Sequence, residues 1–202
     1  MRITLIDSQF GMASNCYLVE SGKEYIIVDP SADIGEIYNR RIDLQGTKPK
    51  LVLLTHVHYD HIKCIDSYAR AGVKIYVSHN EGKYLSDSHY NCARFLGAGD
   101  YSYSGEYEEL CEGDKISFGD TTLTVLETPG HSLGSLCYLG DGVMFTGDTL
   151  FERGGYGRYD LPGGDVVALE ASLRRLLDMP KETVIYPGHC GSSTIGQTKK
   201  YF

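Results

Sequence analysis

Three histidines and one aspartate occur within six consecutive positions of this sequence, namely His56, His58, Asp60 and His61. They directly follow the apolar run at residues 51–54, which is typical of a buried strand that would present the polar cluster at its C-terminal end. Imidazole and carboxylate groups are ligands for zinc, iron and manganese. The spacing therefore indicates a metal site, and the site holds two ions if further ligands come from elsewhere in the chain.

Three more potential ligands lie just past apolar runs in the second half of the sequence. His131 follows residues 121–127, Asp148 follows residues 143–146, and His189 follows residues 183–186. Each stands beside a glycine, which lets the backbone turn sharply, and loops at strand ends are where a rigid scaffold presents functional groups. The complete set of candidate metal ligands is His56, His58, Asp60, His61, His131, Asp148 and His189.

The seven candidates can be divided between two metal sites. The first site would take His56, His58 and His131, and the second would take Asp60, His61 and His189. Asp148 would bridge the two ions. Each ion then has about four protein ligands and room for a water or hydroxide.

Strands outnumber helices in the pattern that must position these residues. We expect strands at residues 3–6, 16–20, 25–28, 51–54, 74–77, 115–118, 121–127, 135–139, 143–146 and 183–186. We expect helices at residues 33–40, 60–71 and 166–178, and a helix followed by an irregular, tyrosine-rich insertion within residues 79–112. The two halves look alike, each with strands, a ligand-bearing loop and a helix, so we expect residues 1–202 to form one α/β domain.

Four motifs in register resemble those of the metallo-β-lactamase superfamily, and of its glyoxalase-II-like hydrolase branch in particular. They are Thr-His-x-His-x-Asp-His, Thr-Pro-Gly-His-Ser-x-Gly-Ser, Gly-Asp-Thr-Leu-Phe and Pro-Gly-His, beginning at Thr55, Thr128, Gly147 and Pro187. The resemblance spans nearly the whole chain. It implies a four-layer αβ/βα sandwich with the metals at the edge of two facing sheets. Asp29 matches that family's early aspartate near the metal site, and we expect Asp29 and Thr55 to support the ligands from behind.

The sequence departs from the family pattern at three places. Lys63 and Cys64 stand where a Gly-Gly pair is common, and Cys190 stands where a glycine is usual. The sequence ends at Phe202, so we expect no C-terminal helical domain of the kind that binds glutathione in a full-length glyoxalase II.

The expected activity is hydrolysis of a thioester of the S-lactoylglutathione type, or of a related ester, by a hydroxide that bridges two divalent metals. Zinc is the first choice, with iron or manganese as alternatives. Asp60 is the candidate catalytic residue, because a carboxylate of the second site can also orient the nucleophile. One alternative is a persulfide dioxygenase with a single iron on His56, His131 and Asp148. Another is a metal-binding or redox-sensing module without turnover, suggested by Cys64 and Cys190.

Composition narrows the range of partners. The net charge of -8 argues against binding to a nucleic-acid backbone, and no apolar run approaches the length of a membrane span. An acid at Asp7 argues against a signal peptide, so we expect a cytoplasmic protein acting on a small molecule. Most cysteines, Cys190 included, are interpreted as buried thiols, and Arg158 and Asp160 as an internal ion pair. The tyrosine-rich residues 84–107 are predicted to line a substrate pocket, to make a subunit contact or to form a packed lid.

Overall fold

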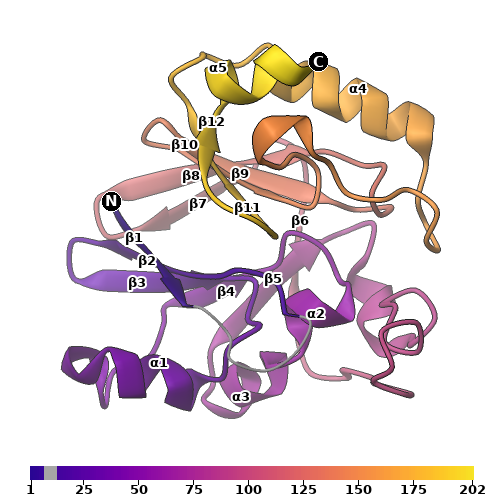
Figure 1. Ribbon diagram of the computed structural model, residues 1–202. Coiled ribbons are helices and arrows are strands. Elements are labelled where there is room, and N and C mark those ends of the chain that lie inside the picture. Colours follow the sequence, from indigo (N-terminus) through magenta and orange to yellow (C-terminus); the bar gives the residue numbers. More distant parts are fainter. Residues whose placement is uncertain (7–12) are drawn as a thin grey trace.

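Two six-stranded sheets face each other, and helices cover the outer face of each sheet (Figure 1). This computed structural model describes residues 1–6 and 13–202. In Figure 1, α1 and α3 lie against the lower sheet, while α4 and α5 lie against the upper one. The arrangement is the four-layer αβ/βα sandwich of the α/β class that the sequence predicted.

The first sheet has the strand order β1-β2-β3-β4-β5-β6. Its first three strands are antiparallel, whereas β3 to β6 run parallel and need crossover connections, which carry the helices of the lower layer. The elements of this half are β1 (Arg2–Ile6), β2 (Cys16–Ser21), β3 (Glu24–Val28), α1 (Ile34–Arg40), β4 (Leu51–Leu53), α2 (Tyr59–Ile62), α3 (Ile65–Arg70), β5 (Lys74–Ser78) and β6 (Glu108–Leu110).

The second sheet has the order β12-β11-β10-β9-β8-β7. It is antiparallel except between β10 and β11, which are parallel and joined by a crossover through α4. The elements of this half are β7 (Lys115–Phe118), β8 (Thr121–Glu127), β9 (Leu136–Gly140), β10 (Val143–Gly147), α4 (Val166–Leu177), β11 (Val184–Pro187), β12 (Ser193–Thr194) and α5 (Ile195–Thr198).

The alternation of side chains along the strands explains the layers. In β2, Cys16 and Leu18 join the apolar cluster under α1 and α3, while Tyr17 and Val19 join the cluster between the two sheets. A third cluster lies under α4 and includes Leu169 from that helix. The sheets are therefore buried on both faces near the middle, which fixes their register against slippage.

Two stretches differ from the sequence-based prediction. The helix expected over residues 60–71 is split into α2 and α3, because at Cys64 the backbone leaves the helical path and its N–H donates to the carbonyl of Pro30 at 3.0 Å. The helix expected after residue 79 is only the short 3-10 segment Gly82–Ser86, and β6 extends the first sheet beyond it. No described helix is long and apolar enough to cross a membrane. That residues 1–202 form one domain stays a prediction.

Candidate metal centre

The candidate ligands come from loops at the carboxyl ends of strands in both sheets. The chain leaves β4 at Leu53 and presents His56 and His58 before it enters α2, whose first turn carries Asp60 and His61. The loops after β8, β10 and β11 supply the remaining three candidates, His131, Asp148 and His189. These strand ends meet at one edge of the sandwich, and all seven predicted residues come together there.

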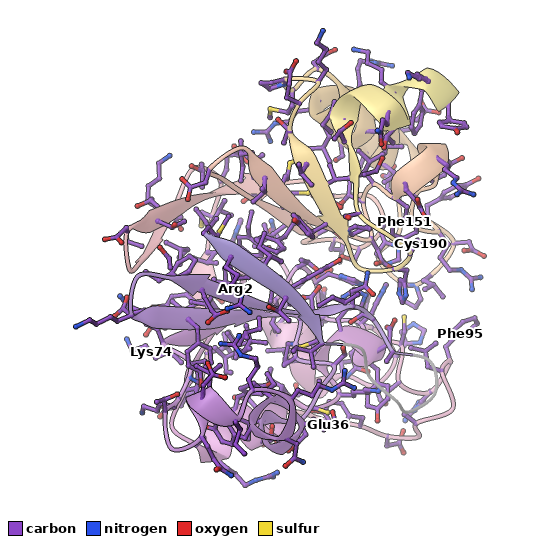
Figure 2. All side chains as sticks on the ribbon, turned by 60° about the vertical axis from the view of Figure 1, so that its left-hand side comes forward. Arg2, Glu36, Lys74, Phe95, Phe151 and Cys190 are labelled. Carbon is purple, nitrogen blue, oxygen red and sulfur yellow. The ribbon has the colours of Figure 1, made fainter. Side chains whose placement is uncertain are left out.

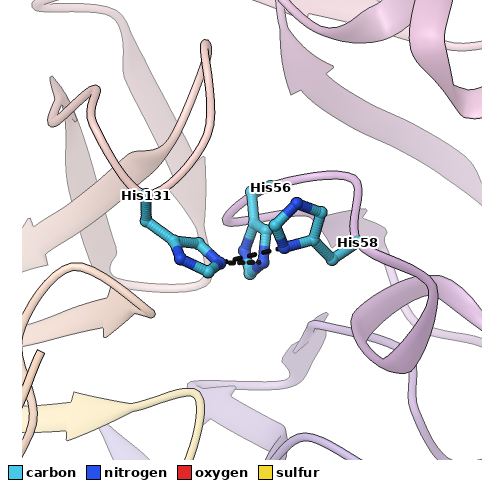
Figure 3. A group of neighbouring side chains, drawn as sticks. All are labelled: His56, His58 and His131. Atoms are coloured by element: carbon cyan, nitrogen blue, oxygen red, sulfur yellow. Dashed lines mark hydrogen bonds between the residues drawn. The ribbon is translucent and has the colours of Figure 1, made fainter. Parts of the chain in front are cut away.

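A first group consists of three buried histidines (Figure 3). The Nε2 atom of His131 lies 2.9 Å from Nδ1 of His58 and 3.2 Å from Nε2 of His56. His131 reaches the group from the second sheet, whereas His56 and His58 come from the first. The first group therefore combines residues from both halves of the molecule.

A second group lies beside the first and contains Asp60, His61 and His189. The Nε2 atom of His189 is 3.1 Å from Oδ2 of Asp60, and Nε2 of His61 is 3.8 Å from the same oxygen. The motif glycine before His189 is required here, because a Cβ atom at Gly188 would lie 2.2 Å from Oδ1 of Asp148. Close approach of the backbone, and not only a sharp turn, explains that glycine.

Asp148 lies between the two groups. Its Oδ1 atom is 3.3 Å from Nε2 of His61, and its Oδ2 atom is 3.6 Å from His131 and 3.5 Å from His189. The carboxylate therefore contacts members of both groups, as the predicted bridging role requires. The ligand atoms of His56, His61 and Asp148 also lie within 4.8 Å of one another, so His56 is within reach of either group.

Hydrogen bonds behind the imidazoles fix their tautomers. His131 Nδ1 donates to the carbonyl of Arg158 at 2.7 Å, and His61 Nδ1 donates to Oδ2 of Asp29 at 2.8 Å. Both acceptors lack a proton to give, so each ring carries a proton on Nδ1 and its Nε2 atom points into the centre. Thr55 lies behind His56, with Oγ1 3.1 Å from His56 Nδ1.

Asp29 lies behind His61 together with Thr55, the two residues for which the sequence predicts a supporting role. Its Oδ1 atom accepts the backbone N–H of Thr55 at 2.7 Å, and its Oδ2 atom accepts the Thr55 hydroxyl at 2.7 Å as well as the His61 ring. The hydroxyl proton is used in that bond, so Thr55 Oγ1 is left to accept the proton of His56 Nδ1. One buried carboxylate thus orients two of the histidines.

The donor set fits divalent metal ions. Three buried polar atoms among the described residues have no hydrogen-bond partner: His58 Nε2, His61 Nε2 and Asp148 Oδ1. The Nε2 lone pairs of His56 and His131 also face each other at 3.2 Å, which is repulsive unless a cation lies between them. Unpaired buried groups are costly, and nitrogen with carboxylate oxygen is the ligand chemistry of zinc, iron and manganese.

The electrostatics favour the ligand forms of the first group. Burial, reinforced by the neighbouring histidines, lowers the pKa of His56 well below its usual range and that of His58 to about 3. Burial also lowers the pKa of His131. All three rings are therefore neutral near pH 7, and neutral imidazole is the form that binds a metal.

In the second group, neighbouring charges outweigh the effect of burial on the pKa values. Burial alone would raise the pKa of Asp60 and of Asp148, but the neighbouring charge of His61 and further contacts with His189 lower both. Burial alone would lower the pKa of His61, yet the carboxylates of Asp29, Asp148 and Asp60 raise it well above its usual value. The carboxylates of this group are therefore ionised and available as ligands.

A pocket of about 470 Å³ opens onto both groups. Its wall is largely apolar and includes Phe95, Leu96, Phe151, Tyr156 and Leu161. Figure 2 shows Phe95 from the lower half and Phe151 from the upper half at the same edge of the molecule. These apolar residues were missed from the sequence because they carry no chemically distinctive group, and only their place beside the ligands reveals them.

The predictions for the surrounding residues have mixed outcomes. Arg158 and Asp160 form the predicted ion pair at 2.7 Å, and the guanidinium lies 4.9 Å from the ring centre of Phe95. The tyrosines of residues 84–107 that contact the core pack under the first sheet and are absent from the described pocket lining, to which this segment contributes Cys92, Phe95 and Leu96. The segment therefore lines the pocket, as one of the alternatives predicted, but it does so with residues other than its tyrosines.

The prediction that most cysteines, Cys190 among them, are buried was wrong. Cys16, Cys92 and Cys137 are buried, Cys64 is partly buried, and Cys111 and Cys190 are exposed. Cys190 is exposed in the turn directly after His189, with a φ of 67°, and is labelled in Figure 2. The turn that follows His189 points this side chain away from the core.

The fold and the histidine-aspartate cluster define a class of α/β protein with a candidate metal site between two sheets, and comparison with known proteins identifies the family. The sequence profile of the Metallo-beta-lactamase superfamily matches residues 10–189. The chain therefore belongs to the metallo-β-lactamase superfamily.

Relatives in this superfamily match over most of their length. The chain is 34% identical to the probable metallo-hydrolase YqgX of Bacillus subtilis, covering 87% of this chain and 84% of YqgX. It is 32% identical to the hydroxyacylglutathione hydrolase GloC of Haemophilus influenzae, covering 92% of this chain and 90% of GloC.

Solved structures agree with this assignment. The BLEG-1 B3 metallo-beta-lactamase superposes with a TM-score of 0.87 at 31% identity, covering 98% of this chain and 97% of that one. TTHA1623 in a di-iron-bound form gives 0.81 at 32% identity, covering 96% of both chains. ETHE1 from Myxococcus xanthus gives 0.75 at 25% identity, covering 100% of this chain and 83% of that one.

Proposed function

We propose that this protein is a metallohydrolase that cleaves a thioester of the S-lactoylglutathione type, or a related ester, with two divalent metal ions. The observation that carries the proposal is the position of Asp148, whose two oxygens contact His61 on one side and His131 and His189 on the other. A carboxylate between two ligand groups suits a pair of ions better than a single one. The similarity to GloC supports the choice of a thioester.

The proposed ligands are the seven predicted residues, with zinc as the first choice of metal and iron or manganese as alternatives. The di-iron form of TTHA1623 supports keeping iron among them. Two such ions would supply a hydroxide nucleophile at neutral pH and polarise the substrate carbonyl.

The chain's own groups have two tasks beyond metal binding in this proposal. Asp60 is buried, ionised and bonded to His189, so its carboxylate can accept a hydrogen bond from the attacking oxygen and orient it. Phe95, Leu96 and Phe151 exclude water around the acyl group. A thiolate is a good leaving group, so the reaction needs no acidic side chain beside the departing sulfur. The substrate is then a small molecule, and neither nucleic acid nor a membrane takes part in the cytoplasmic reaction proposed.

The test measures hydrolysis of S-lactoylglutathione together with metal content. His58→Ala and Asp148→Ala should each abolish hydrolysis and lower the bound metal, because each removes one ligand. Asp120→Ala is the matched control, since Asp120 is an exposed carboxylate in the β7–β8 turn and should leave both measurements unchanged. Full activity of the Asp148→Ala protein would rule out the proposal.

A persulfide dioxygenase is the second candidate, and the structural similarity to ETHE1 favours it. One iron would then be held by His56, His131 and Asp148. Metal analysis with an oxygen electrode separates the two functions. One iron per chain and oxygen uptake with glutathione persulfide would identify the dioxygenase, whereas two metals and thioester cleavage would identify the hydrolase.

A further inference from the structure

Glu81 is a buried carboxylate that lies outside the candidate metal centre. Only 2% of the residue is exposed, and it follows β5 in the turn that begins at Ser78. A buried ionisable group needs strong compensation, because removal from water disfavours its charged form and raises the pKa of Glu81. The donors that surround this carboxylate therefore need an explanation.

Those donors belong to the two loops that carry the first histidine group. The Oε2 atom of Glu81 accepts the backbone N–H of Val57, the residue between His56 and His58, at 3.2 Å. The loop directly after His131 also faces this carboxylate, because the Ser132 side chain and the backbone N–H groups of Leu133 and Gly134 lower the pKa of Glu81 against the effect of burial. One side chain thus lies against ligand-bearing loops from both halves of the sandwich.

The fit around Gly134 is independent evidence for the same contact. A Cβ atom at Gly134 would lie 2.6 Å from Cγ of Glu81 and 2.6 Å from Oγ of Ser78. The loop after His131 therefore approaches Glu81 as closely as only glycine allows. This explains the second glycine of the Thr-Pro-Gly-His-Ser-x-Gly-Ser motif, which has no ligand beside it.

We propose that Glu81 is a positioning residue for the first metal site, because it ties the loop of His56 and His58 to the loop of His131. The inference rests on the proposed function, which makes these three histidines metal ligands. Glu81 acts through Val57 and Gly134 rather than through the imidazoles themselves. Without it, the spacing of three ligands from two different sheets would depend on the loops alone.

To position both loops, the Glu81 side chain must accept a hydrogen bond at every contact. A carboxylate only accepts hydrogen bonds, so it can satisfy donors from both loops at once. Glu81→Gln keeps the size of the side chain but turns an NH2 group towards the surrounding donors. This substitution should loosen the connection between the two loops without opening a cavity.

The experiment titrates the metal-free protein with Co²⁺ and records the visible absorption spectrum, which responds to the geometry of the ligands. Glu81→Gln should weaken binding of one of the two Co²⁺ ions at least tenfold and change the spectrum, while circular dichroism stays that of a folded protein. Leu123→Ala is the control. Leu123 is fully buried in β8, near the end opposite His131, so its truncation should lower Tm and leave cobalt affinity and spectrum unchanged.

Wild-type affinity and spectrum in Glu81→Gln would overturn the inference, and so would an equal loss of affinity in Leu123→Ala. If Glu81→Gln does not fold, Gly134→Ala replaces it in the experiment, because the added methyl group must displace Glu81. Unchanged cobalt binding in Gly134→Ala would also overturn the inference. The assay uses no substrate. A wild-type protein that binds no Co²⁺ would therefore contradict the proposed function itself.

Discussion

The Asp29 carboxylate sets the orientation of His61. It accepts hydrogen bonds from the His61 ring and from the backbone N–H and hydroxyl of Thr55, all within 2.8 Å. The backbone of Asp29 has a φ of 54°. Asparagine tolerates this left-handed conformation, so Asp29→Asn changes the charge without straining the backbone. We expect metal affinity to fall about 10- to 100-fold, as for other partners of metal-binding histidines.

Competition with a chromophoric chelator measures that loss. Asp141→Asn is a matched control, because Asp141 also has a positive φ, of 49°, and also accepts a threonine hydroxyl, from Thr121 at 2.8 Å. It lies in the β9–β10 turn, away from the ligand loops, and should leave metal affinity unchanged. Equal affinities for Asp29→Asn and wild type would show that Asp29 does not support the site.

The backbone conformation of Cys190 is strained. Its φ of 67° lies in the region that costs a residue with a Cβ atom about 1–2 kcal/mol, and glycine avoids this cost. Part of the gain is offset by the larger freedom of glycine in the unfolded chain, about 0.5–1 kcal/mol. We expect Cys190→Gly to raise the free energy of unfolding by about 0.5–1 kcal/mol in urea denaturation. Cys190→Ala keeps the Cβ atom and should show no such gain, and equal stabilities of the two variants would contradict the explanation.

At the scale of elements, α4 connects the outer layer to the loop of His131. Asp165 caps the helix, and its Oδ1 atom accepts the N–H groups of Val167 at 2.8 Å and Ala168 at 3.0 Å. Its own N–H donates to the carbonyl of Gly130, next to His131, at 2.8 Å. The start of α4 is thereby fixed against the ligand loop.

Removal of the cap should cost stability. Asp165→Ala leaves helix N–H groups without their acceptor, and we expect the free energy of unfolding to fall by about 1 kcal/mol. Asp165→Asn is the control, because asparagine caps about as well as aspartate. Thermal or urea unfolding of the two variants provides the measurement, and a loss of the same size in both would point to charge rather than to capping.

The sequence predicted the elements that carry a strong periodic pattern. The strands at residues 115–118 and 121–127 have the predicted bounds, and α4 ends one residue before the prediction. The clustering of the seven candidate ligands was predictable for a related reason, because apolar runs locate strand ends and polar residues just beyond them lie at one edge. At these places the local pattern of apolar residues predicts both the strand and the point at which it ends.

Contacts between distant segments were not predictable. Glu81 lies 24 residues from Val57 and about twice that from Ser132, and no local pattern links them. The break at Cys64 depends on a bond to Pro30, and the conformation of Cys190 depends on a turn whose usual glycine is missing. Tertiary contacts decide such positions, and a single sequence does not display them.

For the whole molecule, the candidate metal centre lies between two halves, and each half has an apolar cluster under its outer layer. His56, His58, Asp60 and His61 belong to the first sheet's half, whereas His131, Asp148 and His189 belong to the second. Apolar clusters lie under each outer layer and between the sheets, and their side chains pack independently of the ligands. Removal of the metals should therefore leave the protein folded but less stable.

The size of this effect follows from mass action. Ions present at 1,000 times their Kd stabilise the folded state by about 4 kcal/mol per site if they do not bind the unfolded chain. For a chain of this length each kcal/mol corresponds to about 2–4 °C in Tm, so a chelator should lower Tm by about 10 °C or more. Scanning calorimetry with and without the chelator measures this shift. Asp148→Ala should melt near the chelated wild type and respond little to the chelator, because its contacts to both ligand groups are gone. A wild-type Tm that does not change on chelation would mean that the seven residues hold no ion that couples the two sheets.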